Sequence, residues 1–222
     1  SRGLGDVYKR QFTSGAGNWC TWMFGRDLVN WNNNFTWAKW VTPSRDLISA
    51  FKQEGDEVRF KESIVYYDCN WSNYYPSDNY PFMYKCRSAN SSIIKYRYAD
   101  VLLLKAEALI MQDTPDLEGA ADIIDKVRDR AKLGALPTSV RSNKNAMLNA
   151  LLKERRLELA FEGQRWFDLV RLDKVEEVMN AVYAKDSGRK AQIYTFDKNS
   201  YRLPIPQSVI DANDKIHQNP GY

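Results

Sequence analysis

The densest pattern of charged and apolar residues in the chain is Glu154-Arg-Arg-Leu-Glu-Leu-Ala-Phe-Glu-Gly-Gln-Arg-Trp-Phe-Asp-Leu-Val-Arg171. Its charges recur at intervals of three and four residues, the spacing of neighbours on one helical face. Gly163 divides the pattern, so we expect two helices joined by a turn. The side chains that we expect to form a structural ion-pair network across this turn are Arg155, Arg156, Glu158, Glu162, Arg165, Asp168 and Arg171.

Two interpretations of this charged segment compete. In the first, Glu158 and Glu162 are a carboxylate pair for glycoside hydrolysis, which needs two carboxylates at a controlled distance. In the second, Arg155, Arg156 and Arg165 satisfy those carboxylates, which then stay ionised and are poor general acids. We favour the structural interpretation and predict no catalytic residue.

The chain on either side of this segment, from residue 95 to 182, has an apolar period of 3.6 residues, which is typical of helices. The residues that we expect on the packed side of the first helix are Tyr98, Val101, Leu102, Lys105 and Leu109. The expected helices span 96–112, a stretch from Asp116 towards a stop at Gly134, a stretch from about Asn145 to Gly163, and 165–182.

These helices form two successive hairpins with small residues at their contacts, the pattern of a tetratricopeptide-like α-α superhelix. The predicted fold class is therefore mainly α, with few short strands. The domain scheme has a helical repeat-like region at 95–182 and a loop-rich lobe at 12–94, in which 44–53 is a helix. An extended segment at 183–222 packs on the helices, with a short strand at 193–196.

The loop-rich lobe is exceptionally aromatic: Phe12 to Tyr84 contains 18 aromatic residues in 73, including six of the seven tryptophans. Aromatic platforms interleaved with asparagines suit sugars, which offer apolar C–H faces and hydroxyl edges. The alternative is that most of these rings are core, because Trp and Tyr bury large areas. The predicted ligand-binding residues are Trp31, Trp37, Trp71, Asn73, Tyr74 and Tyr75, with Tyr74 and Tyr75 the best candidates for an exposed platform.

Composition excludes several classes of function. The only histidine is His217, so histidine-based catalysis and multi-histidine metal sites are nearly excluded. The net charge of +4 falls to +2 without residues 1–11, which have the character of a translated adaptor scar. No basic stripe remains, and we predict no nucleic-acid binding.

Cofactor signals are equally sparse. Cys20, Cys69 and Cys86 are widely spaced, so one disulfide can form but none is required. Asp68-Cys-Asn-Trp-Ser72 has the alternating oxygen ligands of a calcium loop, but Asn73 and Asn79 stand where such a loop has glycine and glutamate. We predict no cofactor or metal, with calcium as a weak possibility.

Several segments, in this order, resemble the C-terminal half of SusD/RagB-type proteins. The resemblance covers the chain well from about residue 40. The segments that carry it are Tyr96-Arg-Tyr-Ala-Asp-Val-Leu-Leu-Leu-Lys-Ala-Glu-Ala-Leu109, Ile124-Asp-Lys-Val-Arg-Asp-Arg-Ala131, the Glu154–Leu169 segment, Leu203-Pro-Ile-Pro-Gln207 and Gln218-Asn-Pro-Gly-Tyr222.

This resemblance implies a nutrient-binding lipoprotein on the extracellular face of a Bacteroidetes-type outer membrane. Such proteins bind glycans or other nutrients without breaking bonds, and they act with a SusC-type TonB-dependent transporter. The signal peptide and lipidated cysteine that attach the family to the membrane are not in this chain, so we expect it to be the later part of a longer protein. The alternatives are a peptide or other non-glycan ligand, a glycoside hydrolase, and a purely structural partner of the transporter.

Overall fold

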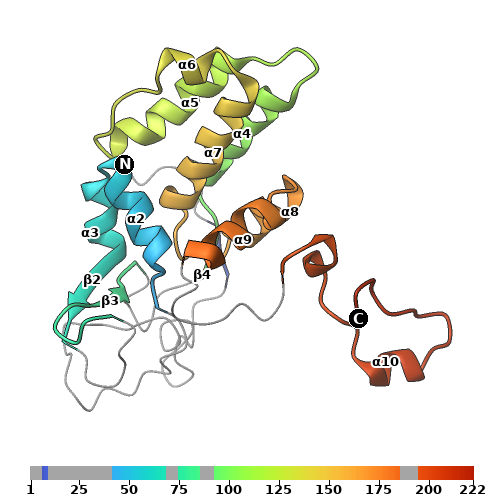
Figure 1. Ribbon diagram of the computed structural model, residues 1–222. Helices are drawn as coiled ribbons and strands as arrows, with labels where there is room; N and C mark the ends of the chain where they lie inside the picture. Colours follow the sequence, from blue (N-terminus) through green and yellow to red (C-terminus); the bar gives the residue numbers. More distant parts are fainter. Residues whose placement is uncertain (1–6, 10–41, 69–74, 86–92, 186–194) are drawn as a thin grey trace. The chain divides into compact units, whose positions relative to one another are not determined.

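The computed structural model describes residues 7–9, 42–68, 75–85, 93–185 and 195–222. These residues are mainly helical, which confirms the predicted fold class (Figure 1). The chain divides into two compact units, Ser1–Gly163 and Gln164–Tyr222, which are described separately. The domain boundaries expected at 11/12, 94/95 and 182/183 stay predictions.

The first unit combines two small antiparallel ladders with a group of helices. Strand β2 pairs with β3 in register from Ile64 opposite Met83 to Tyr67 opposite Tyr80. Strand β1, which lies in the segment expected to be an adaptor scar, pairs with β4. The elements are β1 (Val7–Lys9), α2 (Arg45–Glu54), α3 (Glu57–Ser63), β2 (Ile64–Tyr67), β3 (Tyr80–Met83), β4 (Ile93–Tyr96), α4 (Tyr98–Met111), α5 (Leu117–Arg130), α6 (Thr138–Arg141) and α7 (Lys144–Glu158).

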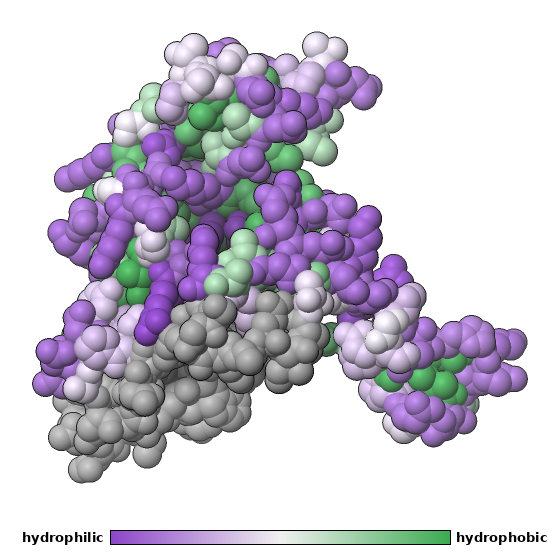
Figure 2. All heavy atoms as spheres, in the orientation of Figure 1, coloured by the Kyte–Doolittle hydropathy of each residue, from purple (hydrophilic) through white to green (hydrophobic). Residues whose placement is uncertain are grey.

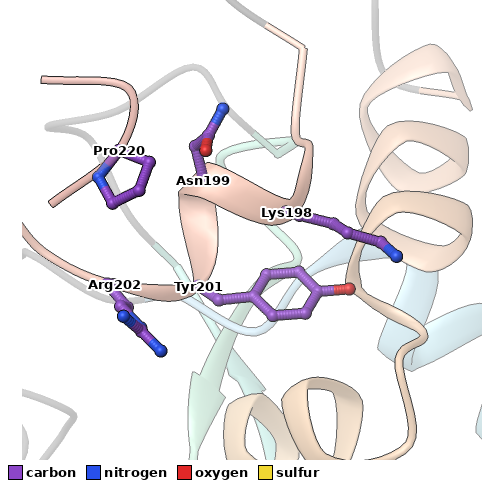
Figure 3. A pocket seen from close by; sticks show the side chains of 5 residues that line it. All are labelled: Lys198, Asn199, Tyr201, Arg202 and Pro220. Carbon is purple, nitrogen blue, oxygen red and sulfur yellow. The ribbon is translucent and has the colours of Figure 1, made fainter.

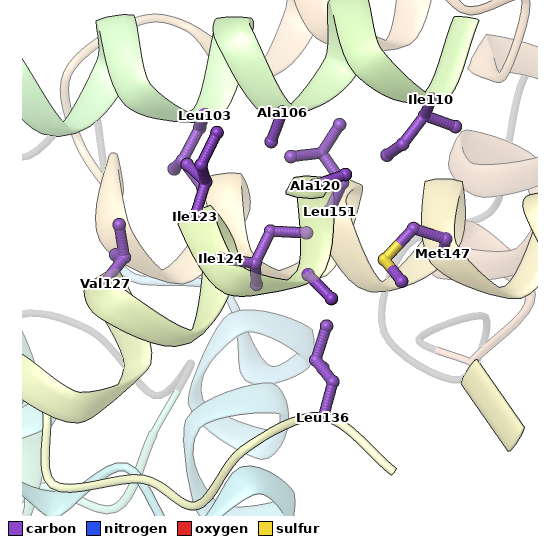
Figure 4. Packing of buried hydrophobic residues seen from close by; sticks show 11 residues of the cluster. Leu103, Ala106, Ile110, Ala120, Ile123, Ile124, Val127, Leu136, Met147 and Leu151 are labelled. Carbon is purple, nitrogen blue, oxygen red and sulfur yellow. The ribbon is translucent and has the colours of Figure 1, made fainter. Parts of the chain in front are cut away.

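The main core lies between α4, α5 and α7, which pack on one another (Figure 4). Helix α4 contributes Leu103, Ala106 and Ile110, all fully buried. The small side chain at Ala106 lets the α5 backbone approach closely. The residues that α5, α7 and the α5–α6 connection add are Ala120, Ala121, Ile123, Ile124, Val127, Leu136, Met147 and Leu151.

The buried face of α4 agrees only in part with the predicted one. Leu102 and Leu109 are partly buried and pack against the core, whereas Tyr98 and Val101 are 59% and 52% exposed. The sequence Val-Leu-Leu-Leu at 101–104 makes the helix apolar on more than one face, so periodicity alone does not fix which side is buried. Leu104 and Met111 are also more than one-third exposed, and Figure 2 shows apolar patches between hydrophilic side chains over the helices of this unit.

The helix ends follow local capping chemistry. Ser44, Asp116 and Asn143 accept hydrogen bonds from backbone N–H groups in the first turns of α2, α5 and α7. The expected stop at Gly134 is wrong, because α5 ends at Arg130 and Lys132 takes the left-handed conformation with φ of 60°. Helix α7 ends at Glu158, and residues 159–163 form a turn before the second unit.

The second unit contains α8 (Arg165–Arg171), α9 (Val175–Lys185), the 3₁₀-helix η2 (Lys198–Tyr201) and α10 (Gln207–Asp211). The single helix expected at 165–182 is therefore wrong. Asp173, with φ of 53°, separates α8 from α9, and aspartate tolerates this left-handed backbone better than most residues. Of the strand expected at 193–196, residues 193 and 194 lie outside the described part, and Thr195 and Phe196 are not in a strand.

We expect a large loss of stability when a side chain of the main core is truncated. Leu151→Ala leaves a cavity where a fully buried side chain contacts α4 and α5. We expect the free energy of unfolding to fall by about 2–5 kcal/mol in urea titrations followed by circular dichroism. Asn149→Ala, on the exposed side of the same helix, is the matched control and should change stability by less than about 0.5 kcal/mol. Equal losses in the two variants would contradict this assignment of the core.

Candidate functional site

Three carboxylates lie one helical turn apart at the end of the first unit. Glu154 and Glu158 belong to the last two turns of α7, and Glu162 lies in the turn that follows. The side chains are 2%, 2% and 5% exposed, so all three are withdrawn from solvent. Buried carboxylates need cationic partners, and the first unit supplies them from several elements.

Glu158 is the most heavily paired of the three. Its Oε1 accepts from Arg97 Nη1 at 2.5 Å and from Arg130, and its Oε2 accepts from Arg59 Nη1 at 3.1 Å. Burial by itself raises the pKa of this carboxyl, but Arg97 and Arg130 outweigh burial and lower the pKa to about 2. Glu158 is therefore ionised across the physiological pH range.

Glu154 has a different balance of burial and pairing. Arg59 Nη1 donates to its Oε1 at 2.6 Å, and Arg128 Nη1 lies 3.4 Å from its Oε2. Burial raises the pKa of Glu154, and the attraction of Arg59 only partly offsets this effect. Arg59 also binds Asp56, the residue that caps α3, so one guanidinium joins α3 to α7.

Glu162 completes the cluster with Arg97 and Lys85. Arg97 Nε donates to its Oε2 at 2.8 Å, and Lys85 Nζ lies 2.6 Å from its Oε1. Lys85 Nζ also donates to the Glu158 carbonyl at 2.7 Å. Burial lowers the pKa of this lysine, although Glu162 opposes the shift. We call Arg59, Lys85, Arg97, Arg128, Arg130, Glu154, Glu158 and Glu162 the ion-pair junction.

Glu158 and Glu162 lie in an ion-pair network, as predicted, but Arg155 and Arg156 are not their partners; that the network crosses the Gly163 turn stays a prediction. Arg155 pairs with Asp100 of α4 at 2.9 Å, and Arg156 pairs with Asp46 of α2 at 2.5 Å. Neither arginine forms an ion pair with Glu158 or Glu162, whose partners come from other elements. Sequence spacing identifies neighbours on one helix and cannot identify cations brought in by tertiary packing.

In the second unit, the predicted pair of Asp168 and Arg171 is confirmed at 2.7 Å. Arg165 begins α8, three residues before Asp168. The predicted pairing of Arg165 with Asp168 stays a prediction.

The junction has the chemistry of a structural centre. A general acid must hold a proton, whereas the pKa of Glu158 is about 2 and both its oxygens accept from arginines. Glu154 has a raised pKa, but both its oxygens face guanidinium groups and its side chain is 2% exposed. These contacts therefore favour the structural interpretation over the carboxylate pair of a glycosidase.

Of the predicted ligand-binding residues, the structure describes Tyr75; Trp31, Trp37, Trp71, Asn73 and Tyr74 lie outside the described residues. Tyr75 is half-buried rather than a fully exposed platform. Its hydroxyl donates to the Pro43 carbonyl at 2.7 Å, its ring meets Tyr80 edge-on at 5.6 Å, and the Arg45 guanidinium carbon lies 5.4 Å from its centroid. Tyr75 thus anchors the chain at the start of the described segment 75–85.

The described residues contain no group of three or more His, Cys, Asp and Glu side chains arranged to hold a metal ion. Residues 69–72 of the calcium-like segment lie outside the described residues, so the absence of a cofactor stays a prediction. Within the same residues, every helix is too short or too polar to cross a membrane.

Comparison with known proteins identifies a family. Residues 75–222 match the sequence profile of the SusD family, which confirms the resemblance noted from the motifs. SusD-like protein P38 of Formosa agariphila is 42% identical over 99 residues, covering 42% of this chain and 19% of P38. SusD-like protein P2 of the same organism is 35% identical over 143 residues, covering 61% of this chain and 27% of P2.

Solved structures of this superfamily share the fold. A laminarin binding SusD-like protein has a TM-score of 0.56 and 28% identity, over 82% of this chain and 38% of that one. Surface glycan-binding protein A from Bacteroides uniformis has a TM-score of 0.62 and 21% identity, over 89% and 45%. The chain thus spans less than half the length of these relatives.

We expect a large loss of stability when one charge of the ion-pair junction is removed. Glu158→Gln leaves Arg59, Arg97 and Arg130 without their shared anionic acceptor. We expect the free energy of unfolding in urea to fall by about 3–5 kcal/mol, as for other buried pairs that lose one partner. Glu57→Gln, whose pair with Lys61 is two-thirds exposed or more on both sides, should cost less than about 1 kcal/mol. A loss below about 1 kcal/mol in Glu158→Gln would contradict a structural role.

The pKa values of Glu154 and Glu158 are shifted in opposite directions, so we expect their contributions to stability to depend on pH in opposite ways. The pKa of Glu158 lies below its ordinary value of 4.5, so its stabilising contribution is complete above 4.5 and is lost as pH falls to about 2. The pKa of Glu154 lies above 4.5, so its contribution is complete below 4.5 and is lost as pH rises.

Unfolding free energies of the wild type, Glu158→Gln and Glu154→Gln between pH 3 and 7 measure both effects. As pH falls below 4.5, the advantage of the wild type over Glu158→Gln should shrink. As pH rises above 4.5, the stability of Glu154→Gln relative to the wild type should improve. Differences with the same slope would show that the assignment of burial and pairing is wrong.

Proposed function

Because this chain belongs to the SusD family, we propose that it is the later part of a protein that binds extracellular oligosaccharides or polysaccharides and delivers them to a SusC-type TonB-dependent transporter. The observation that carries the proposal is the family match over residues 75–222. The laminarin binding SusD-like protein, at 28% identity and a TM-score of 0.56, supports a glycan as the ligand class.

The aromatic composition of the lobe supports the same ligand class. Aromatic rings present flat apolar faces to the C–H faces of sugars, and asparagine amides both donate to and accept from hydroxyl groups. The stretch Trp71-Ser-Asn-Tyr-Tyr75 supplies three rings and one amide within five residues. Tyr75, at the end of this stretch, is fixed by contacts with Pro43 and Tyr80.

The ion-pair junction attaches the lobe to the helical scaffold. Arg59 comes from α3, Lys85 follows β3 and Arg97 precedes α4, so three points of the lobe and its boundary bind the carboxylates of α7 and its following turn. A ligand held by loops between these points is therefore held by the helical scaffold as well. Binding and release require no bond to break, and the proposed protein is a carrier rather than an enzyme.

The location follows from the family in the same way. We propose the extracellular face of the outer membrane, with attachment through a lipid anchor elsewhere in the complete protein. The transporter is the proposed partner, and nucleic acid is not expected because the net charge of +4 is small. A peptide in place of a glycan is the main alternative ligand.

An array of glycans and peptides tests the proposed ligand class. We expect the protein to bind glycans, and the double variant Trp71→Ala, Tyr74→Ala to bind them about tenfold or more weakly in isothermal titration, because each lost platform costs about 1 kcal/mol. Tyr98→Ala removes an equally large exposed ring from α4 and is the control. Binding to peptides with no glycan signal would overturn the proposal, and unchanged glycan affinity in the double variant would place the binding site elsewhere.

A further inference from the structure

The last residues of the second unit fold back on the proline-rich segment Leu203-Pro-Ile-Pro206. Gln218 uses both ends of its side-chain amide on Ile205: its Oε1 accepts from the backbone N–H at 2.8 Å and its Nε2 donates to the carbonyl at 2.9 Å. Asn219 Nδ2 donates to the Leu203 carbonyl at 2.6 Å, and the Tyr222 hydroxyl donates to the Arg202 carbonyl at 3.1 Å. Because proline has no N–H, these side chains replace a backbone ladder.

This folded-back tail forms one wall of a pocket of about 270 Å³. The lining residues are Lys198, Asn199, Tyr201, Arg202 and Pro220 (Figure 3). The tail approaches the opposite wall closely: Gly221 has φ of 95°, and a Cβ there would lie 2.7 Å from Asn199 Cβ. Only glycine fits this position without displacing the wall, so the shape of the pocket depends on the tail.

The opposite wall is η2, and it is held rigidly. Asp197 accepts from the backbone N–H groups of Asn199 at 2.8 Å and Ser200 at 3.2 Å in a capping box. The Tyr201 hydroxyl donates to Asp173 Oδ1 at 2.7 Å, and this bond raises the pKa of Tyr201 to about 12. The phenol therefore stays protonated, and its ring is fixed beside the pocket.

The surface of the pocket is mostly apolar, and hydrogen-bond donors belong to a few of its lining side chains. Arg202 carries five N–H donors and no acceptor, and within the described part of the chain no residue accepts from its guanidinium group. Lys198 Nζ lies 3.9 Å from Asp173 Oδ2, a carboxylate that Tyr201 already occupies. In Figure 3 the Lys198 and Tyr201 side chains extend to one side, and Arg202 and Pro220 lie on the other.

We propose that this pocket binds an acidic sugar residue, which carries a carboxylate or a sulfate group. The Tyr201 and Pro220 rings offer apolar surfaces for the sugar ring, and the Arg202 guanidinium offers paired donors to the anionic group. Asn199 adds an amide for a hydroxyl group. The inference rests on the proposed function, and it specifies the ligand class at a place distant in sequence from the aromatic lobe.

Isothermal titration of the whole chain with three oligosaccharides of equal length tests this proposal. The probes are a galacturonic acid trimer, a sulfated galactose trimer and a neutral glucose trimer. We expect at least one acidic probe to bind about tenfold or more tightly than the neutral one, with an affinity that falls as salt rises. The stronger of the two acidic probes identifies carboxylate or sulfate as the preferred group.

Two variants assign the binding to this pocket. Arg202→Gln should lower the affinity for the acidic probe about tenfold or more and reduce the salt dependence of that affinity. Lys215→Gln removes an exposed charge elsewhere in the same unit and should leave the affinity unchanged. Arg202→Gln keeps the backbone carbonyl that Tyr222 uses, so thermal unfolding should match the wild type.

The outcomes separate this proposal from the proposed function. Equal affinity for acidic and neutral probes, or acidic binding unaffected by Arg202→Gln, would overturn the pocket assignment and leave glycan binding intact. Absence of binding to any glycan on the array would overturn both proposals.

Discussion

The structure of the first unit depends on the buried carboxylate of Glu158. It accepts from Arg59 of α3, from Arg97 just before α4 and from Arg130 at the end of α5, so one side chain of α7 binds three separate parts of the chain. Its side chain is 2% exposed, and burial alone would favour the neutral form. The arginines reverse that preference. If the carboxylate were removed, its buried cationic partners would lose a shared anion, which is far more costly than losing a surface ion pair.

Two kinds of interaction stabilise the first unit: apolar packing and the ion pairs of this junction. The helices α4, α5 and α7 are held by apolar packing, because their buried faces are aliphatic. A second, smaller apolar cluster joins Phe51 of α2 and Ile64 of β2 to Leu157 of α7. Arg59, Lys85 and Arg97 add ion pairs with the carboxylates of α7 and its following turn. Directional ion pairs therefore supplement apolar packing around β2 and β3, whose Ile64, Phe82 and Met83 side chains are buried. Surface loops on such a scaffold can carry ligand contacts without altering it.

The sequence predicted the scaffold better than it predicted the contacts. The boundaries of α2, α4 and the start of α7 follow from periodicity and capping residues, which are local properties. The buried face of α4 was predicted only in part: Leu102 and Leu109 pack against the core, but the exposed Val101 and Leu104 are as apolar as the buried Leu103 and Ile110. The break at Asp173 was missed because a single left-handed residue leaves the apolar period intact. The partners of Arg155 and Arg156 depend on Asp100 and Asp46, more than 50 residues away.

The difference between scaffold residues and ligand contacts explains why the sequence of this chain identifies its family and does not identify its ligand. The motifs that match the family include Glu154, Arg155 and Glu158, each no more than 2% exposed, and Gln218, whose amide holds the backbone of Ile205. Such groups have their partners within the protein, so a change in any of them leaves an unpaired buried or backbone group. Their pattern therefore specifies the fold and carries no information about the ligand. Specificity must come from groups with unused hydrogen-bonding capacity at the surface, and within the described residues the Arg202 guanidinium beside the Tyr201 ring is such a group.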